Sequence, residues 1–374
     1  MKVVDGDSHF IEPLDVYPRY IDPAFRERAM RVERDPASGK QRMLVDGRPM
    51  RLGSRDIDEM LSIIVGYGQK EEGSALDEFD RSLMSGGDWQ DMDKRVRFLD
   101  AEGIDYQVLF PTLGLLWEGE VQDPGLAAAL CRAYNTWAFE VCAGRLDRLF
   151  PSAHISLRDP ELAVDEIQRV AKLGAHSIML GSAPVAGKSF GHADYDPIWA
   201  AAQDASIAVT IHPAGNKEYL GSAWYKHRNP GFMFISMNVI QDPRMSLSTM
   251  VYDGVFERFP ELRVATVESM GSWVGEWIER FDYRYQYMRH TSQMKRPIRE
   301  YFARNIWINA DPSEKLLPYI VQFVGDEKFF VGSDYPHAEG FTQPVQTMRG
   351  LLSDLPAASL DKILGTNAAA FYRI

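Results

Sequence analysis

Four residues of this sequence have the side-chain types and spacing to hold a divalent metal ion. Asp7 and His9 stand two positions apart in the run KVVDGDSHF, so on a β-strand their side chains point to the same face. His212 ends the apolar run AVTIH, and Asp334 follows the run FFVGS. Imidazole and carboxylate ligands of this kind suit Zn²⁺, Mn²⁺ or Fe²⁺. The pattern predicts a metal centre built from these four residues.

Three further residues could add donors to that centre. Glu12 and His337 each come three positions after a predicted ligand, and Glu268 ends the run RVATVE. One interpretation is a second metal site that shares a ligand with the first. The other is a single ion, with Glu12 capping the local chain and His337 orienting Asp334. The shared second site predicts two ions per chain, and the capping and orienting roles predict one.

Aromatic side chains are concentrated shortly after His212, in the segment SAWYKHRNPGFMF. They could line an apolar substrate pocket or pack the loop onto the rest of the protein. A further histidine ends the run FPSAH and could face the same pocket or lie hydrogen-bonded in the interior. The candidates for the pocket wall are therefore Trp224, Tyr225, Phe232, Phe234 and His154.

Short apolar runs alternate with amphipathic segments along most of the chain. Eight runs are expected as strands, at about residues 2–8, 106–111, 148–155, 175–180, 207–212, 263–268, 305–310 and 328–333. Continuous apolar strands separated by helices indicate a parallel sheet covered on both faces. Eight such units favour an α/β fold of the (β/α)₈ TIM-barrel type, and no G-x-G-x-x-G follows any run. Active sites of such barrels lie at the carboxyl ends of the strands, where the candidate ligands fall.

Residues 14–90 interrupt this alternation. The stretch RAMRVERDPASGKQRMLVDGRPM predicts a β-hairpin with its turn at DPASGK, and the remainder is a polar, glycine-rich loop. We expect residues 1–374 to form one barrel domain, with 14–90 as an insertion after the first strand that acts as a lid.

The overall composition excludes several classes of partner. A net charge of −12 argues against nucleic acid, and no run of about 18 apolar residues predicts a membrane span. Cys131 and Cys142 lie about three helical turns apart, which argues against a disulfide, and the first residues lack a signal peptide's apolar stretch. We expect a cytoplasmic protein with a small-molecule substrate, either a homo-oligomer such as a dimer or paired with a related subunit.

Five segments together resemble the amidohydrolase superfamily, in the branch of aminocarboxymuconate semialdehyde decarboxylase and the benzoate-type decarboxylases. They are DGDSHFIEP, AVTIHPAG, GVFERFPELRVATVES, VGSDYPH and ILGTNAAAFY. The resemblance covers the first strand and most of residues 91–374. It implies a metal held by a pair on strand one, a strand-five His and a strand-eight Asp. Those roles fall to Asp7, His9, His212 and Asp334.

Two positions depart from that branch. Asp7 stands where the first ligand is usually His or Glu, and Glu268 lies near the position where a proton-transferring His often stands. Some relatives of this barrel resemble dinuclear enzymes, among them an iron-dependent thioesterase and a manganese/iron hydroxylase. The departures therefore leave the proton-transfer residue and the number of metal ions open.

The leading expectation from these residues is metal-assisted hydrolysis of a small amide, ester, thioester or lactone. The ion would lower the pKa of a bound water and polarise the substrate carbonyl. Candidate catalytic residues that would move protons are Asp334, Glu268 and His337. The alternatives are non-oxidative decarboxylation of an aromatic or muconate-type acid, O₂ activation at a dinuclear iron or manganese/iron centre, and an inactive barrel subunit of a complex.

Overall fold

Eight parallel strands form a nearly closed barrel in the computed structural model, as the sequence predicts. The structure describes residues 2–36, 39–50, 91–215, 220–225, 233–337, 340–341 and 343–374. Neighbouring strands pair in chain order: β1 (Val4–His9), β5 (Tyr106–Phe110), β6 (Leu149–His154), β7 (Ser177–Gly181), β8 (Ala208–His212), β9 (Val264–Thr266), β10 (Ile306–Ala310) and β11 (Phe329–Val331).

The first and last strands meet at their carboxyl ends. The backbone N–H of His9 donates to the carbonyl of Tyr335 (2.7 Å). The N–H groups of Ser333 and Asp334 donate to the carbonyl of Asp7 at 3.0 and 2.9 Å. Residues more than 320 positions apart in the sequence are thereby fixed side by side. This closure brings the two ligand candidates of β1 next to the candidate that follows β11.

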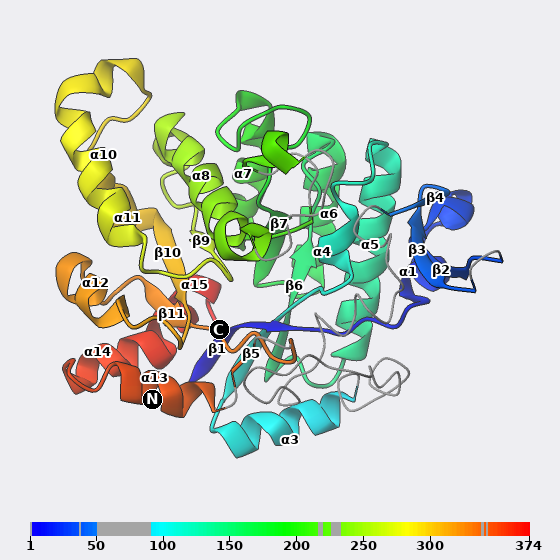
Figure 1. The fold of residues 1–374 in the computed structure, drawn as a ribbon, viewed down its shortest axis with the longest axis horizontal. Helices are drawn as coiled ribbons and strands as arrows, with labels where there is room; N and C mark the ends of the chain where they lie inside the picture. The colour runs from blue at the N-terminus through cyan, green and yellow to red at the C-terminus, as the bar shows by residue number, and fades with distance from the viewer. Residues whose placement is uncertain are drawn as a thin grey trace.

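Helices pack around the strands of the barrel (Figure 1). They are α3 (Met92–Glu102), α4 (Gly114–Trp117), α5 (Pro124–Val141), α6 (Pro160–Lys172), α7 (Asp196–Asp204), α8 (Val239–Tyr252), α9 (Val255–Arg258), α10 (Val274–Met288), α11 (Ile298–Asn305), α12 (Leu317–Val324), α13 (Pro344–Leu351), α14 (Ala357–Asp361) and α15 (Asn367–Tyr372). Asp91, Asp123 and Asp159 cap the helices that follow them by accepting backbone N–H groups. Among the described residues, no helix is long and apolar enough to cross a membrane.

The barrel has an apolar interior separate from the layers under its helices. Val4, Ala265 and Phe330, from three different strands, pack together with Phe371 and Tyr372 of α15. The Tyr372 hydroxyl also donates to the carbonyl of Gly6 (2.8 Å). This packing closes the amino-terminal end of the barrel and leaves the carboxyl end for polar side chains.

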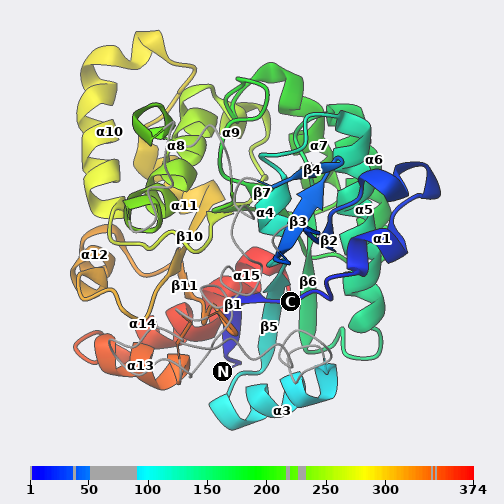
Figure 2. The same ribbon diagram turned by 45° about the vertical axis from the view of Figure 1, so that its right-hand side comes forward.

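The predicted hairpin is confirmed. β2 (Arg31–Arg34) and β3 (Gln41–Val45) pair antiparallel, and β4 (Arg48–Pro49) adds a third strand. Figure 2 shows this small sheet beside α1 (Val16–Tyr20) and α5. Residues 51–90, the rest of the expected insertion, lie outside the described residues, so its role as a lid stays a prediction.

Gly332 makes the close approach of β11 and β1 possible. A Cβ atom at this position would collide with the Cβ of Asp7 and lie 2.6 Å from Nδ2 of Asn309. We expect Gly332→Ala to lower the free energy of unfolding by about 1–3 kcal/mol because the strands must move apart. Gly350→Ala is the control, since its Cβ would meet nothing within 4 Å in α13 and should raise stability by about 0.5–1 kcal/mol. Urea unfolding measures both; equal stability of the two variants would contradict the expectation.

Candidate metal centre

Two buried histidines, His9 and His212, each direct an unprotonated ring nitrogen into the carboxyl end of the barrel. Nδ1 of His9 lies 2.9 Å from the carbonyl oxygen of Pro111, and Nδ1 of His212 lies 2.8 Å from that of Pro213. A carbonyl oxygen can only accept, so each Nδ1 carries the ring proton and each Nε2 keeps a lone pair. Neither Nε2 atom has a hydrogen-bond partner among the described residues. Metal-binding histidines are held in this way.

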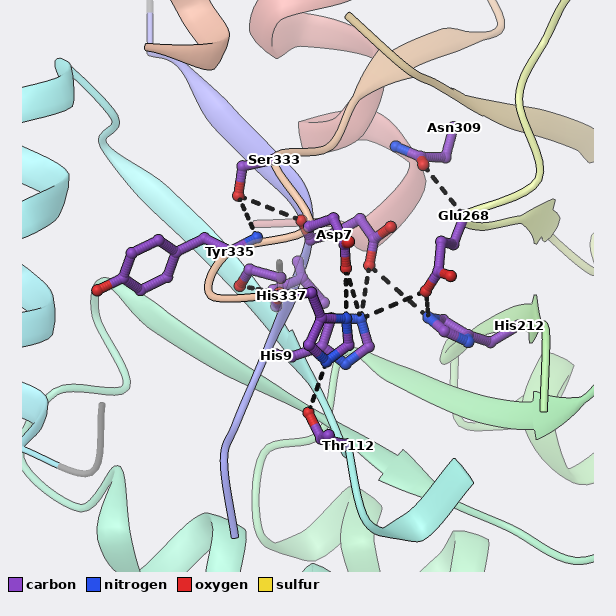
Figure 3. A network of polar contacts seen from close by, with 12 residues as sticks. Asp7, His9, Thr112, His212, Glu268, Asn309, Ser333, Tyr335 and His337 are labelled. Carbon is purple, nitrogen blue, oxygen red and sulfur yellow. Dashed lines mark hydrogen bonds and ion pairs between the residues drawn. The ribbon is translucent and has the colours of Figure 1, made fainter. Parts of the chain in front are cut away.

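Two carboxylates face these nitrogen atoms (Figure 3). Oδ1 of Asp7 lies 3.6 Å from Nε2 of His9 and 3.9 Å from Nε2 of His212. Oδ1 of Asp334 lies 3.3 Å from Nε2 of His9. Such separations are typical of donors around one ion at about 2.0–2.3 Å from each. Oδ1 of Asp7 is buried with no hydrogen-bond partner among the described residues, so the donor set fits a metal ion.

Glu268 and His337 complete the cluster. Oε2 of Glu268 lies 3.2 Å from Nε2 of His212 and 3.7 Å from Nε2 of His9. The ring of His337 stacks on that of His9 with centroids 3.9 Å apart, and its Nδ1 lies 2.8 Å from Oδ1 of Asp334. The structure thus brings together six of the seven residues that the sequence offered as ligands: Asp7, His9, His212, Glu268, Asp334 and His337.

A proton is held between His337 and Asp334. The hydroxyl of Thr112 donates to the carbonyl of Phe10 (2.6 Å), so Nε2 of His337 must donate to that hydroxyl oxygen at 2.8 Å. Nδ1 of the same ring faces a carboxylate oxygen of Asp334. A proton must lie between them, either on a doubly protonated His337 or on Asp334.

Glu12 is the seventh candidate, and it lies outside this cluster. Its carboxylate accepts the backbone N–H groups of Thr112, Leu113 and Gly114, each at 3.0 Å, just before and at the start of α4. Glu12 thereby fixes the loop that carries Thr112, the partner of His337. These contacts agree with the second interpretation of Glu12, in which its carboxylate caps the local backbone.

We expect Glu12→Gln to lower the free energy of unfolding by about 1–3 kcal/mol, because one acceptor oxygen is replaced by a donor that faces buried N–H groups. Bound metal per folded chain, measured by plasma mass spectrometry, should not change. A loss of metal from folded Glu12→Gln protein would return Glu12 to the ligand set.

The cluster carries more negative charge than a buried site tolerates without a cation. Burial raises the pKa of Asp7 well above its usual range, and the charges of Asp334 and Glu268 raise it further. Burial, together with the neighbouring His337 and His212, lowers the pKa of His9 to about 3 and keeps the ring neutral, as a ligand must be. A divalent cation would relieve the repulsion among the carboxylates.

Opposite effects act on Glu268 and His212. Burial alone would raise the pKa of Glu268, but His212 and His9 lower it overall. Burial alone would lower the pKa of His212, but Glu268 and Asp7 raise it overall. Glu268 and Asp334 also adopt left-handed backbone conformations, with φ of 48° and 53°. Such strain in non-glycine residues concentrates at functional sites.

Asp5 supports the centre from beneath, a role that the sequence did not reveal. It is buried and accepts hydrogen bonds from the hydroxyl of Ser333 (2.6 Å) and the side-chain amide of Gln107 (2.8 Å). These contacts link β1 to the residue before Asp334. Asp5 and Asp7 alternate in the run DGD, and the spacing alone does not show which of the two carboxylates faces the metal centre.

A cavity of about 290 Å³ opens beside the cluster. Its walls are Asp7, Ser236, Val239, Ile240, Glu268, Met270, Asn309, Asp311, Ser313, Gly332, Asp334 and Phe341. Asn309 and Asp311 were missed from the sequence, although both stand at the end of the seventh apolar run and the strand-end rule applied to them as well.

The residues predicted for the pocket wall lie elsewhere or are not described. His154 is buried at the end of β6, with Nε2 3.4 Å from Oε2 of Glu118, and is not part of this cavity's wall. Trp224 is 80% exposed. Phe232 and the side chains of Tyr225 and Phe234 lie outside the described residues, so their contact with substrate stays a prediction.

Known proteins resemble this chain along most of its length. A family model described as amidohydrolase matches residues 4–374. The 2-amino-3-carboxymuconate-6-semialdehyde decarboxylase of Dictyostelium discoideum is 26% identical over 286 residues, 75% of this chain and 76% of that protein.

Two solved structures share the fold. An amidohydrolase from Mycobacterium avium subsp. paratuberculosis K-10 has a TM-score of 0.84 and 25% identity, covering 99% of both chains. A dihydroxybenzoic acid decarboxylase from Polaromonas sp. JS666, with bound manganese and the inhibitor 2-nitroresorcinol, has a TM-score of 0.64 and 20% identity, covering 79% of this chain and 93% of that one. Because the family model matches nearly the whole chain, this protein belongs to the amidohydrolase family.

Proposed function

We propose that this protein is a metal-dependent, non-oxidative decarboxylase of a small aromatic or muconate-type carboxylic acid. The observation that carries the proposal is the convergence of bare, buried donor atoms of Asp7, His9 and His212 beside a small cavity. Support for decarboxylation over the hydrolysis expected first comes from the relatives, since the Dictyostelium and Polaromonas proteins are named decarboxylases of such acids.

Asp7, His9, His212 and Asp334 would hold the metal ion. The ion would supply positive charge that orients the substrate carboxylate and stabilises negative charge that develops during the reaction. The manganese in the Polaromonas structure makes Mn²⁺ the first ion to test. The Nδ1 hydrogen bonds of His9 and His212 keep both rings in the ligand tautomer.

Glu268 would move the proton, since its carboxyl group lines the cavity and lies against both histidines. Decarboxylation requires a proton at the carbon that bears the leaving carboxylate. The Glu268 carboxyl would deliver it, the bond from that carbon to the carboxylate would break, and its electron pair would restore the double bond as CO₂ leaves. The net reaction consumes one proton, which solvent returns to Glu268.

Hydrolysis is the second candidate, and one observation favours it. His212 and His9 lower the pKa of Glu268 despite its burial, which keeps the group in the carboxylate form. A carboxylate is the form needed by a general base that takes a proton from water. Decarboxylation needs the protonated form at the same position.

Two assays separate these reactions. Manganese-loaded protein is incubated with 2,6-dihydroxybenzoate and other hydroxybenzoates while CO₂ is measured, and in parallel with esters, thioesters and lactones in H₂¹⁸O. The proposal expects CO₂ release without ¹⁸O in the organic product. Incorporation of ¹⁸O into a carboxylic product, with no CO₂ from any acid, would replace decarboxylation by hydrolysis.

A further inference from the structure

Glu268 leaves the strand conformation at the point where it enters the cavity wall. In β9 and just beyond it, Ala265 and Val267 belong to the apolar interior of the barrel, while Val264 packs under the helices. Side chains alternate along a strand, so a continued strand would turn Glu268 toward the helices. With a φ of 48°, Glu268 departs from this alternation and lines the cavity. Met270 is also left-handed, with φ of 58°, and lines the same cavity.

Side chains from outside the loop hold this unusual backbone in place. Non-glycine residues rarely adopt the left-handed conformation, and it persists only where the surroundings fix it. The side-chain oxygen of Asn309 accepts the backbone N–H of Glu268 at 3.2 Å (Figure 3). The indole N–H of Trp273 donates to the carbonyl oxygens of the next two residues at 3.0 and 2.9 Å. These contacts fix the first half of the loop between β9 and α10.

Glu314 holds the second half of the loop. It stands between β10 and α12, and its side chain is buried. Its carboxylate accepts the N–H of Gly271 at 2.8 Å, and both the N–H and the hydroxyl of Ser272 at 2.6 Å. It also accepts the N–H of Asp311 at 2.8 Å, which joins the loop after β9 to the loop after β10. Burial raises the pKa of Glu314, and these hydrogen bonds oppose that rise.

The loop connects these contacts directly to Glu268. Gly271 lies three residues after Glu268, and Met270 between them lines the cavity. Glu314 itself is not among the described residues of the cavity wall, so its influence on a bound substrate passes through the loop. Release of Gly271 and Ser272 would let the strained backbone relax, and Glu268 would then turn away from its present neighbours.

We propose that Glu314 is a positioning residue for the reaction, which holds the loop after β9 so that the carboxyl group of Glu268 faces His212 and the cavity. The inference rests on the proposed function for the part that Glu268 plays in proton transfer. It adds a residue outside the cavity wall on which that transfer depends. Proton transfer requires its two heavy atoms within hydrogen-bond reach, so displacement of Glu268 by about 1 Å would slow the reaction.

Glu314→Gln tests the proposal. Both oxygens of Glu314 accept N–H groups, so an amide turned either way places its NH₂ group against a buried donor. In manganese-loaded protein, kcat for CO₂ release from 2,6-dihydroxybenzoate, counted per metal-loaded chain, should fall about 10–100-fold. KM should change less than about 2-fold and metal per chain should stay the same, since Glu314 holds neither substrate nor ion.

A double-mutant cycle with Glu268→Gln shows whether the effect passes through Glu268. Residues that act as a unit have non-additive effects. The variant that carries both Glu314→Gln and Glu268→Gln should therefore turn over as fast as Glu268→Gln alone. A loss of about 10–100-fold from Glu314→Gln in both backgrounds would overturn the proposal.

Glu166→Gln is the matched control. This glutamate on α6 is also buried, and its carboxylate accepts from Asn135 and from Arg169, each at 2.8 Å. It is not among the described residues of the cavity wall. The substitution should lower the free energy of unfolding and leave kcat per metal-loaded chain unchanged. A fall in kcat equal to that of Glu314→Gln would assign the effect to lost stability and overturn the proposal.

A milder variant serves if Glu314→Gln does not fold. Ser272→Ala removes one donor to Glu314 and should lower kcat about 3-fold or more with KM unchanged. Unchanged kcat in that variant would overturn the proposal.

The proposed function fails separately from this inference. Protein that releases no CO₂ but incorporates ¹⁸O into the products of esters or thioesters loses the decarboxylase, and the same cycle is then measured on hydrolysis. If no substrate is turned over, crystal structures of the wild type and of Glu314→Gln decide. The proposal expects the Glu268 carboxylate to move by about 1 Å. A carboxylate that stays 3.2 Å from Nε2 of His212 in the variant would overturn it.

Discussion

Replacing His212 with alanine is expected to remove most of the bound metal and nearly all activity. His212 enters the cluster from β8, opposite the pair on β1, and its Nε2 lies 3.2 Å from Glu268 and 3.9 Å from Asp7. No other ring nitrogen of the described cluster approaches from that side, so nothing there replaces it. Loss of a ligand or its support commonly lowers metal affinity or activity about 10–100-fold or more.

The measurement is metal per chain by plasma mass spectrometry, with turnover measured in parallel. Wild-type protein stripped by a chelator should recover both on addition of Mn²⁺, while His212→Ala should recover neither at the same concentration. The control is His192→Ala, since this histidine is about half exposed, lies in the loop before α7 and does not belong to the cluster. Full metal occupancy in His212→Ala would remove this residue from the ligand set.

The fold could be predicted closely because the barrel strands are short, buried and largely apolar runs that alternate with helices. The run predicted at 207–212, for example, ends at His212 as β8 does, and the run predicted at 148–155 ends one residue beyond β6. The candidate ligands were found from the strand order, since parallel strands deliver their carboxyl ends to one face of the barrel. Asp7 and Asp334 lie at opposite ends of the sequence, and they come together only if β1 lies against β11. A barrel of eight consecutive parallel strands implies this contact.

The remaining parts of the site depend on contacts that sequence spacing does not show. Glu12 turns away from the cluster because three backbone N–H groups, 100 or more positions later, compete for its carboxylate. His337 faces Asp334 because Thr112 holds its other nitrogen. The aromatic segment after His212 indicated an apolar surface but not its direction, and Trp224 points largely to solvent. Composition gives the number of apolar side chains in a loop and does not give their orientation.

Glu268→Gln is expected to lower kcat about 100–10,000-fold while the protein keeps its fold, because this substitution removes the carboxyl group proposed to move the reacting proton. Gln has nearly the same shape as Glu, but its amide carries no charge and does not take up or release a proton in this pH range. The reasoning holds for both candidate reactions, since decarboxylation needs Glu268 as an acid and hydrolysis needs it as a base. The pH profile of kcat separates them: activity that depends on protonated Glu268 falls as pH rises through its pKa in the complex, and activity that depends on the carboxylate falls as pH decreases.

Metal counting on the same variant decides the number of ions. Oε2 of Glu268 lies within reach of both histidines, and Glu268, His9, Asp334 and His337 form a second group of donors within 4.8 Å of one another. If two ions share these groups, the wild type should hold two per chain and Glu268→Gln one, because a second cation needs this negative charge. If one ion is present, both proteins should hold one and differ only in turnover.

Glu261→Gln, the same change at an exposed position before β9, is the control and should match the wild type in metal content and in turnover. One ion per chain with unchanged turnover in Glu268→Gln would leave Glu268 a structural residue and exclude it from the proton transfer proposed above.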